Sequence, residues 1–311
     1  MPQICLDNRV SIAEVDDQTG QTLLHSVIDR KHYAILPYLI REFKKENAKM
    51  TSKGIGVDHL DANNFSALHV AVAKGSVEAV SVLFAAGASA NTQMHVESVP
   101  CTGNSPIGIA CKKGNIEIVE LLLQNGANVD ANAVVYASIL EDQSIYALLE
   151  AANLKTKKPK ALVLAKNKDR SSTVHVACCI SKDDQALVAL QRVVELAVEA
   201  GTADVTAFVN SQNTRGVSPL MMACRLKNME TIRHLLVEHK ANAFAQDCDG
   251  NSALHHTEHI MEGSDEVILL VCKKGGGERL PEIKNNLGQT PSLPTKMGEG
   301  MSKGMEKCNN Q

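Results

Sequence analysis

Tryptophan is absent from this chain, and aromatic residues together make up only 3% of it. Hydrophobic residues nevertheless account for 44% of the 311 residues, and Ala, Leu and Val dominate among them. A core of such side chains is substantial but thin, because it lacks the bulky rings that fill the centre of a large enzyme. The composition therefore favours closely packed helices in shallow layers.

A dominant charge is also missing. The chain has 32 Lys and Arg against 35 Asp and Glu, a formal net charge of −3. Binding to nucleic acid depends on neutralising phosphates with a clear basic excess, so we expect no nucleic-acid partner. No apolar stretch reaches the length that crosses a bilayer, and residues 1–10 do not resemble a secretory signal. We therefore expect no membrane partner.

The cysteines lack the spacing of a metal site. There are 9 of them, an odd number, and no two are arranged as C-x-x-C. Scattered cysteines without a secretion signal indicate free thiols in a reducing compartment. We therefore expect a cytoplasmic protein, with the nucleus as the alternative.

One short phrase recurs along the chain, and it opens with a Ser or Thr that we call the anchor of each copy. The anchors are Thr22, Ser66, Ser105, Ser172, Ser218, Ser252 and Thr290. Many anchors have a His three residues later, and the four histidines are His25, His69, His175 and His255. Such copies predict a repeat protein, in which each unit is stabilised by its neighbours.

The phrase resembles the Thr-Pro-Leu-His signature of the ankyrin repeat. The most complete copy runs from Thr102 through Ser105 and Gly114 to Val129. The step of 34 residues from Ser218 to the next anchor is close to the ankyrin period of about 33. The resemblance implies an all-α, ankyrin-repeat solenoid of about seven helix-turn-helix repeats with short β-hairpin fingers.

The anchors also suggest how the chain is divided. We expect an N-terminal cap at 1–15, an ankyrin-repeat domain at 16–295 and a disordered tail at 296–311. The expected repeats lie near 16–60, 61–101, 102–130, 131–166, 167–212, 213–246 and 247–284, followed by a degenerate cap at 285–295. The repeat at 131–166 is predicted to lack its hairpin, because Asp130 runs almost directly into a helix.

Irregular steps between anchors indicate insertions at 43–57, 92–100 and 187–210. Insertions in repeat proteins usually form loops, often on the binding side. The alternative is that these loops are neutral drift on the surface.

Local rules account for the expected helix ends. An anchor hydroxyl is a good N-cap, and Pro106 and Pro219 follow their anchors at the first helical position, where proline costs least. Gly75 and Gly114 suit a left-handed C-cap at the end of the first helix of a repeat. Each repeat is therefore expected to contain a short first helix, a tight turn and a second helix.

His255 and His259 are the strongest candidates for metal ligands. They lie four residues apart, a spacing that can present two ligands from one helix face. However, no third ligand is evident, and His255 occupies the same repeat position as His25, His69 and His175. The resemblance gives this position a structural role, in which the imidazole bonds the backbone of adjoining turns. We therefore expect no metal and no cofactor.

Cys111, Cys178 and Cys224 invite a catalytic interpretation. All three lie six residues after an anchor, where another repeat has Val72. A buried cysteine behaves as a small hydrophobe, so we expect these thiols to be packed in the core. No catalytic residue is expected, and a metal- or thiol-dependent enzyme is the distant alternative.

The resemblance also implies where a partner binds, because ankyrin repeats usually contact partners through the fingers and the exposed face of the first helices. The matching positions here are Asn63, Phe65, Thr102, Asn104, Asp169, Arg215 and Asp249 on the fingers, and Lys74, Lys112, Lys113, Arg225 and His259 on the helices. Phe65 is expected to be an exposed aromatic contact.

The basic residues among them can attract an acidic peptide or loop, or they can simply complement the helix dipoles. We expect a monomeric, non-catalytic adaptor or scaffold that binds another protein. The alternative is the ankyrin substrate-recognition part of a larger signalling, ligase-adaptor or pathogen effector protein.

Overall fold

The computed structural model describes residues 15–49, 56–92, 105–140, 144–154, 162–257, 264–275 and 280–291. These residues are mostly helical and belong to two compact units, unit 1 at Met1–Asn167 and unit 2 at Lys168–Gln311. The predicted N-terminal cap and the insertion at 92–100 lie almost wholly outside the described residues, and the predicted tail lies entirely outside them.

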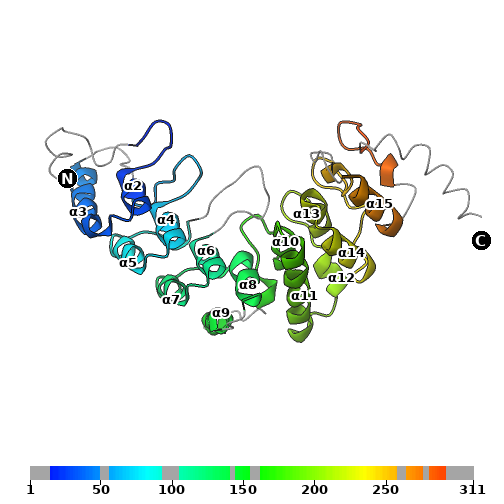
Figure 1. Cartoon of the computed structure of the whole chain (residues 1–311), viewed down its shortest axis with the longest axis horizontal. Helices are drawn as coiled ribbons and strands as arrows, with labels where there is room; N and C mark the ends of the chain where they lie inside the picture. Colours follow the sequence, from blue (N-terminus) through cyan, green and yellow to red (C-terminus); the bar gives the residue numbers. More distant parts are fainter. Residues whose placement is uncertain are drawn as a thin grey trace, which may run out of the picture. The chain divides into compact units, whose positions relative to one another are not determined.

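Unit 1 is a stack of helix pairs. Its first helices α2, α4, α6 and α8 lie side by side in chain order, and α3, α5, α7 and α9 form a second row (Figure 1). The elements of unit 1 are α2 Leu23–Asp29, η1 Tyr33–Ile35, α3 Leu36–Lys49, α4 Ala67–Lys74, α5 Val77–Ala85, α6 Pro106–Lys113, α7 Ile116–Gln124, α8 Ala131–Ser138, α9 Ser144–Leu154 and η2 Leu162–Leu164.

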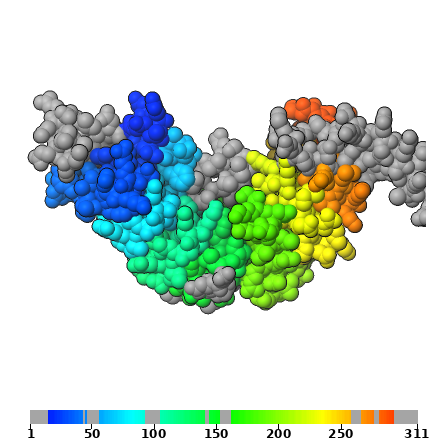
Figure 2. Space-filling view, in the orientation of Figure 1, coloured from blue at the N-terminus to red at the C-terminus, as the bar shows by residue number. Residues whose placement is uncertain are grey.

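Unit 2 repeats this arrangement. Helix α10 packs against α13, α11 against α14, and α14 against α15. The elements of unit 2 are α10 Thr173–Cys178, α11 Asp183–Glu199, α12 Val205–Val209, α13 Pro219–Leu226, α14 Met229–Val237, η3 His255–Thr257, α15 Ser264–Gly275 and η4 Leu280–Glu282. Within each unit the colours of the space-filling view change in chain order, because each repeat packs on its sequence neighbours (Figure 2).

The predicted helix starts are confirmed at five of the seven anchors, and the described residues after Ser252 form a 3₁₀ helix at His255–Thr257. The N-caps of α2, α4, α6, α10 and α13 are Thr22, Ser66, Ser105, Ser172 and Ser218. Pro106 and Pro219 occupy the first turn, as expected. Gly75 and Gly114 end α4 and α6 with φ of 72° and 69°, the left-handed conformation that glycine adopts without strain.

One helix of unit 2 is capped by the repeat before it. The N-cap of α14, Asn228, makes no capping bond with its own side chain. Instead the carboxylate of Asp183, in the first turn of α11, accepts the backbone amides of Glu230 at 2.9 Å and Thr231 at 3.2 Å. The side-chain amide of Asn228 in turn donates to the carbonyl of Ile180 at 2.8 Å. These bonds satisfy helix-terminal groups that would otherwise lack partners.

The core of each unit consists of the apolar faces between the two helix rows. Leu83 and Leu122 are completely buried in unit 1, as is Leu190 in unit 2. Each such leucine stabilises the fold by about 1.5–3 kcal/mol relative to an exposed one. Because a single helix pair has no second layer to cover its apolar face, stability comes from stacking.

Two of the predicted loops are helical instead. The segment 187–210 contains most of α11 and the short helix α12, and the start of 43–57 continues α3 to Lys49. The reason is visible in α11, whose buried residues recur at helical spacing: Ala186, Ala189, Leu190, Val193, Leu196 and Ala197. The expectation that these insertions form loops was therefore wrong over the helical residues.

The described residues include two isolated antiparallel bridges, Val15 with Thr22 and Leu60 with Ser66, and Lys166 and Ser172 are bridge residues as well. The remaining fingers in the described ranges are hydrogen-bonded turns, so hairpins in them stay a prediction, as do the repeat boundaries. The described helices include none that is both long and apolar enough to cross a membrane.

Candidate protein-binding surface

We define a finger as the turn of five residues that precedes an anchor. Four of the described fingers, at 61–65, 213–217, 247–251 and 285–289, have one geometry in common. Each of the four begins with Asp or Asn, whose side-chain oxygen accepts the backbone amides two and four residues later. In the finger at 247–251, Asp247 accepts the amide of Asp249 at 3.0 Å and that of Asn251 at 2.8 Å. The third residue of each finger lies at the tip, and the tips of these four are Asn63, Arg215, Asp249 and Leu287.

Backbone bonds connect each finger of unit 2 to the one before it. The amide of Thr214 donates to the carbonyl of Asp169 at 2.8 Å, and the amide of Cys248 donates to Arg215 at 2.8 Å. The amide of Asn286 continues the series by donating to Asp249 at 3.0 Å. The fingers of unit 2 therefore form a connected row in which every link involves a tip backbone.

Two glutamines reinforce this row from the side. The side-chain amide of Gln212 donates to the carbonyl of Gly216 in its own repeat and to the carbonyl of Gln246 at 3.0 Å. Gln246 repeats the arrangement with Gly250 and, at 3.0 Å, Lys284. One amide group thus uses both of its protons to hold two successive turns.

The anchor histidines connect helices to fingers, as predicted. The Nδ1 atom of His25 accepts the backbone amide of Thr22 at 3.2 Å, so the other ring nitrogen carries the proton. That Nε2–H donates to the carbonyl of Phe65 at 3.0 Å, in the next finger. His175 and His255 make the same bonds to Val217 and Gln289, at 3.0 and 3.1 Å.

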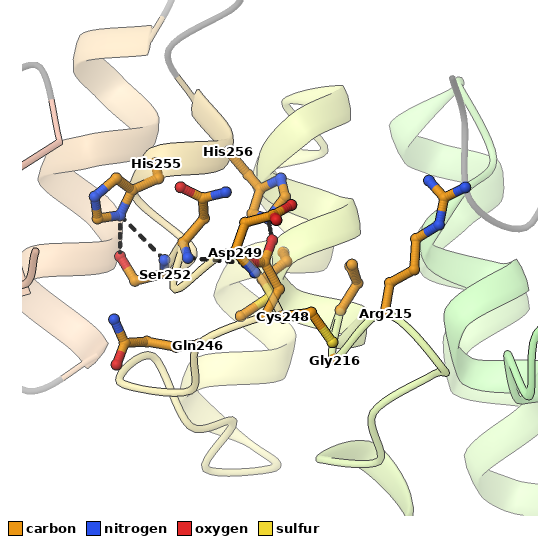
Figure 3. Close-up of polar contacts among 12 residues, drawn as sticks. Arg215, Gly216, Gln246, Cys248, Asp249, Ser252, His255 and His256 are labelled. Carbon is orange, nitrogen blue, oxygen red and sulfur yellow. Dashed lines mark hydrogen bonds and ion pairs between the residues drawn. The ribbon is translucent and has the colours of Figure 1, made fainter. Parts of the chain in front are cut away.

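This geometry explains why these histidines are structural. One ring nitrogen of His255 is engaged by Ser252 (Figure 3). The other bonds to the carbonyl of Gln289. In the first repeat, burial lowers the pKa of His25, which keeps the imidazole in the neutral form that the bonds require. No group of three or more potential metal ligands occurs among the described residues.

Two repeats replace the anchor histidine. Gly108 stands at this position in α6, and the carboxylate of Asp130 takes over the bond to the anchor, accepting the Ser105 hydroxyl at 2.5 Å. Asp130 also accepts the amide of Ala133 at 2.9 Å and is only 4% exposed. Burial raises the pKa of its carboxyl group. Helix α8, which follows no finger, is thus tied to the start of α6 through its own N-cap, Asp130.

In α13 the replacement is Met221, and the following finger is held differently. His256 donates from Nε2 to the second carboxylate oxygen of Asp247 at 2.8 Å, and Asp247 is the residue that organises the finger. Burial lowers the pKa of His256, although the bond to Asp247 opposes this effect. Figure 3 shows Arg215 extending away from this group of contacts.

The basic residues on the first helices have different surroundings. The ammonium group of Lys74 lies 2.8 Å from the carboxylate of Asp29 on the neighbouring helix. Lys112 lies over the ring of Tyr136, 5.3 Å from its centroid, and Lys113 is exposed beside it. The last turn of α6 therefore carries an exposed pair of positive charges, while the charge of Lys74 is compensated.

The structure describes most of the predicted contact residues. Asn63, Lys74, Lys112, Lys113, Arg215 and Asp249 are exposed, whereas Asp169 and Arg225 are half-buried. The expectation that Phe65 is exposed was wrong: it is half-buried, and its ring packs edge-on against His69 with a centroid distance of 6.0 Å. Thr102, Asn104 and His259 lie outside the described residues.

Leu287 is a tip residue that the sequence analysis missed. It is 81% exposed, more than any other large hydrophobic residue described. Its place three residues before Thr290 matches Arg215 and Asp249 before their own anchors, so the repeat register alone was a sufficient signal. Gln212 and Gln246, six residues before their anchors, could have been found in the same way.

The three cysteines at the common core position are completely buried, which confirms their packing role. Burial raises the pKa of Cys111 and Cys224, so these thiols are held in the unreactive protonated form. The Cys248 thiol, by contrast, is exposed on a finger.

Comparisons with known proteins returned several ankyrin repeat domains. Two solved structures similar to this chain are the human ASB11 ankyrin repeat domain and the ankyrin repeat domain of Bcl-3, a member of the IkappaB family. The first is 18% identical with a TM-score of 0.39 and covers 89% of this chain and 93% of that one. The second is 22% identical with a TM-score of 0.36 and covers 88% and 93%. A search of curated protein sequences returned no match.

A family model provides the assignment. The model for ankyrin repeats matches three times, at residues 3–94, 47–133 and 175–280, and together these matches cover more than half of the chain. They include most of the described anchors from Thr22 to Ser252, with their N-caps, left-handed turns and bridging histidines. No enzyme family is indicated. With its helix pairs, bridging histidines and linked fingers, the chain belongs to the ankyrin-repeat family.

Proposed function

We propose that this chain is a non-catalytic adaptor or scaffold that binds another protein along its fingers and the exposed face of its first helices. The finger row supports this best. Its backbone is held by hydrogen bonds, while tip side chains such as Arg215 and Asp249 stay exposed. A surface that is already rigid loses little conformational entropy when a partner binds.

The proposed contact residues are Asn63, Phe65, Lys74, Thr102, Asn104, Lys112, Lys113, Asp169, Arg215, Arg225, Asp249 and His259. We further propose that the protein acts as a monomer in the cytoplasm or nucleus. The free thiols of its described cysteines support a reducing compartment.

An acidic peptide or loop is the proposed partner for the end of α6. Lys112 and Lys113 are adjacent and exposed in its last turn, and no carboxylate among the described residues forms an ion pair with either. Exposed charges of one sign accelerate the encounter with an opposite charge and contribute to specificity.

The test is affinity capture from cell lysate with the full chain and two double variants. Lys112→Glu/Lys113→Glu reverses the proposed contact. Lys273→Glu/Lys274→Glu is the matched control, because these lysines are also adjacent, exposed and in the last turn of a helix, α15. Both variants therefore make the same charge change and lose the same favourable interaction with a helix dipole. Circular dichroism checks that each is folded.

We expect a protein that the wild type and the control variant retain and the Lys112/Lys113 variant loses. Its retention by the wild type should also weaken as salt is raised, because surface charges are screened. Equal retention by all three chains would contradict the basic contact, and the absence of any retained protein would contradict the adaptor proposal.

A further inference from the structure

The finger row of unit 2 carries a pattern of tip side chains that goes beyond general protein binding. Three successive tips are Arg215, Asp249 and Leu287, each three residues before its anchor. The first two are exposed, and Leu287 is 81% exposed. The surface thus presents a positive, a negative and an apolar side chain in that order.

The order of these side chains in space follows from the backbone links. The carbonyl of Arg215 accepts the amide of Cys248, and the carbonyl of Asp249 accepts the amide of Asn286. Each link joins one tip to the residue just before the next tip. The three side chains therefore belong to neighbouring turns, with Asp249 between the other two.

The charge of Asp249, the middle tip, determines which kind of partner segment can bind. The backbone amide of Asp249 is bound by Asp247, but its carboxylate has no hydrogen-bond or ion-pair partner among the described residues. The carboxylate is therefore available to a cation from outside. A partner segment that is acidic throughout would place a negative charge against it, and like charges at an interface are strongly disfavoured.

We propose, building on the proposed function, that this row binds an extended segment of a partner protein that carries an acidic, a basic and an apolar residue in that order, read in either direction. The acidic residue faces Arg215, the basic residue faces Asp249, and the apolar residue covers Leu287. In an extended chain every second side chain points to the same face, so alternate residues can line up along a row of single tips. This partner differs in chemistry from the acidic segment proposed for Lys112 and Lys113.

The test is selection of random peptides displayed on phage, with the full chain as the bait. It is repeated with Asp249→Lys and with the control Asp184→Lys, which makes the same change at an exposed site on α11. Because the Asp249 carboxylate makes no bond within the described residues, its replacement should leave the chain folded.

The wild type and the control should select peptides with a basic residue between an acidic and an apolar one. Asp249→Lys should select an acidic residue at the middle position. A synthetic peptide of the wild-type sequence should bind Asp249→Lys at least about tenfold more weakly, and changing its central Lys to Glu should restore binding to that variant. A third bait, Leu287→Asp, should lose the apolar preference.

Identical peptides from the wild type and Asp249→Lys would overturn the inference, as would peptides without a common order or no enrichment at all. None of these outcomes alters the lysate capture that depends on Lys112 and Lys113. The two proposals can therefore fail separately.

Discussion

The backbone conformation at the end of a helix explains why glycine occurs at several of these positions. The first helix of three repeats ends in the left-handed conformation, at Gly75, Gly114 and Lys227. For an L-residue with a side chain this conformation costs roughly 1–2 kcal/mol, whereas glycine adopts it without strain. Lys227, with φ of 59°, is therefore held in place by its neighbours rather than by its own preference.

Replacing Lys227 with glycine should stabilise the protein by about 1 kcal/mol, because the strain disappears. The reciprocal change, Gly114→Lys, should destabilise it by a similar amount, since the site has φ of 69° and no atom within 4 Å of an added Cβ. Urea unfolding of both variants measures the two effects. Changes of the same sign would show that backbone strain does not determine stability at these sites.

The buried carboxyl group of Asp130 links stability to pH. Because its pKa is raised in the folded protein, the native state holds this proton more tightly than the unfolded chain does. Its contribution to the free energy of unfolding therefore falls as the pH rises above the ordinary value of about 3.9. The amide introduced by Asp130→Asn would have no charge to gain, and its oxygen could still cap Ala133.

We expect Asp130→Asn to be at least as stable as the wild type at pH 7, with its advantage disappearing toward pH 4. Urea unfolding between pH 4 and pH 8 measures the difference in the free energy of unfolding between the two proteins. In this difference the titration of all other groups cancels. A constant difference over this range would mean that Asp130 does not titrate abnormally.

At the scale of elements, the fingers are stabilised by one another. A Cβ added to Gly216, whose φ is 73°, would lie 2.9 Å from the Cα of Asp247 in the next finger. Gly288 has nearly the same φ, 76°, but an added Cβ would meet nothing within 4 Å. The two glycines therefore separate the cost of the backbone conformation from the cost of pushing fingers apart.

Gly216→Ala should destabilise the protein more than Gly288→Ala, because only the first forces neighbouring fingers apart. The conformational part, about 1 kcal/mol, is common to both variants. Hydrogen exchange should show faster exchange of the Cys248 amide in Gly216→Ala, since that amide bonds Arg215 across the contact. Equal loss of stability and unchanged exchange would argue against tight finger stacking.

Much of the element structure could be predicted because it depends on local chemistry. Anchor hydroxyls cap helices, and prolines and glycines fit single backbone conformations, so helix starts and ends were readable from residue types. The helical nature of 187–199 was missed because the irregular step between anchors was given more weight than the buried spacing of Ala186, Leu190 and Val193. The hydrogen bond of His256 with Asp247 could not be predicted, since it depends on how a helix turns toward its own finger.

The positions of the candidate surface residues within their repeats could be predicted, but the contacts that these residues make with neighbouring repeats could not. Arg215 and Asp249 are exposed, as expected from their place before an anchor. The ion pair of Lys74 with Asp29 and the burial of Phe65 depend on packing between neighbouring repeats, which the sequence of one repeat does not contain.

At the scale of the whole molecule, the cysteines should distinguish a binding protein from a thiol enzyme. Among the described cysteines, Cys111, Cys178, Cys224 and Cys272 are buried, Cys179 is half-buried and Cys248 is exposed. Titration of the native protein with a thiol reagent should modify the exposed Cys248 readily, and the buried four only after unfolding. Cys248→Ser identifies its contribution by difference. A very fast reaction at Cys111, Cys178 or Cys224 would instead support the enzyme alternative.

The cap that Asp183 provides to α14 has a consequence for protein engineering. Because the amides at the start of α14 are satisfied from α11, the piece beginning at residue 213 is not a self-sufficient building block. Cutting the chain there, or transplanting that piece behind another ankyrin repeat, would leave those amides to solvent unless the acceptor side chain travels with it. A usable cassette should therefore start before Asp183, so that it contains both the capping carboxylate and the amides of α14 that it accepts.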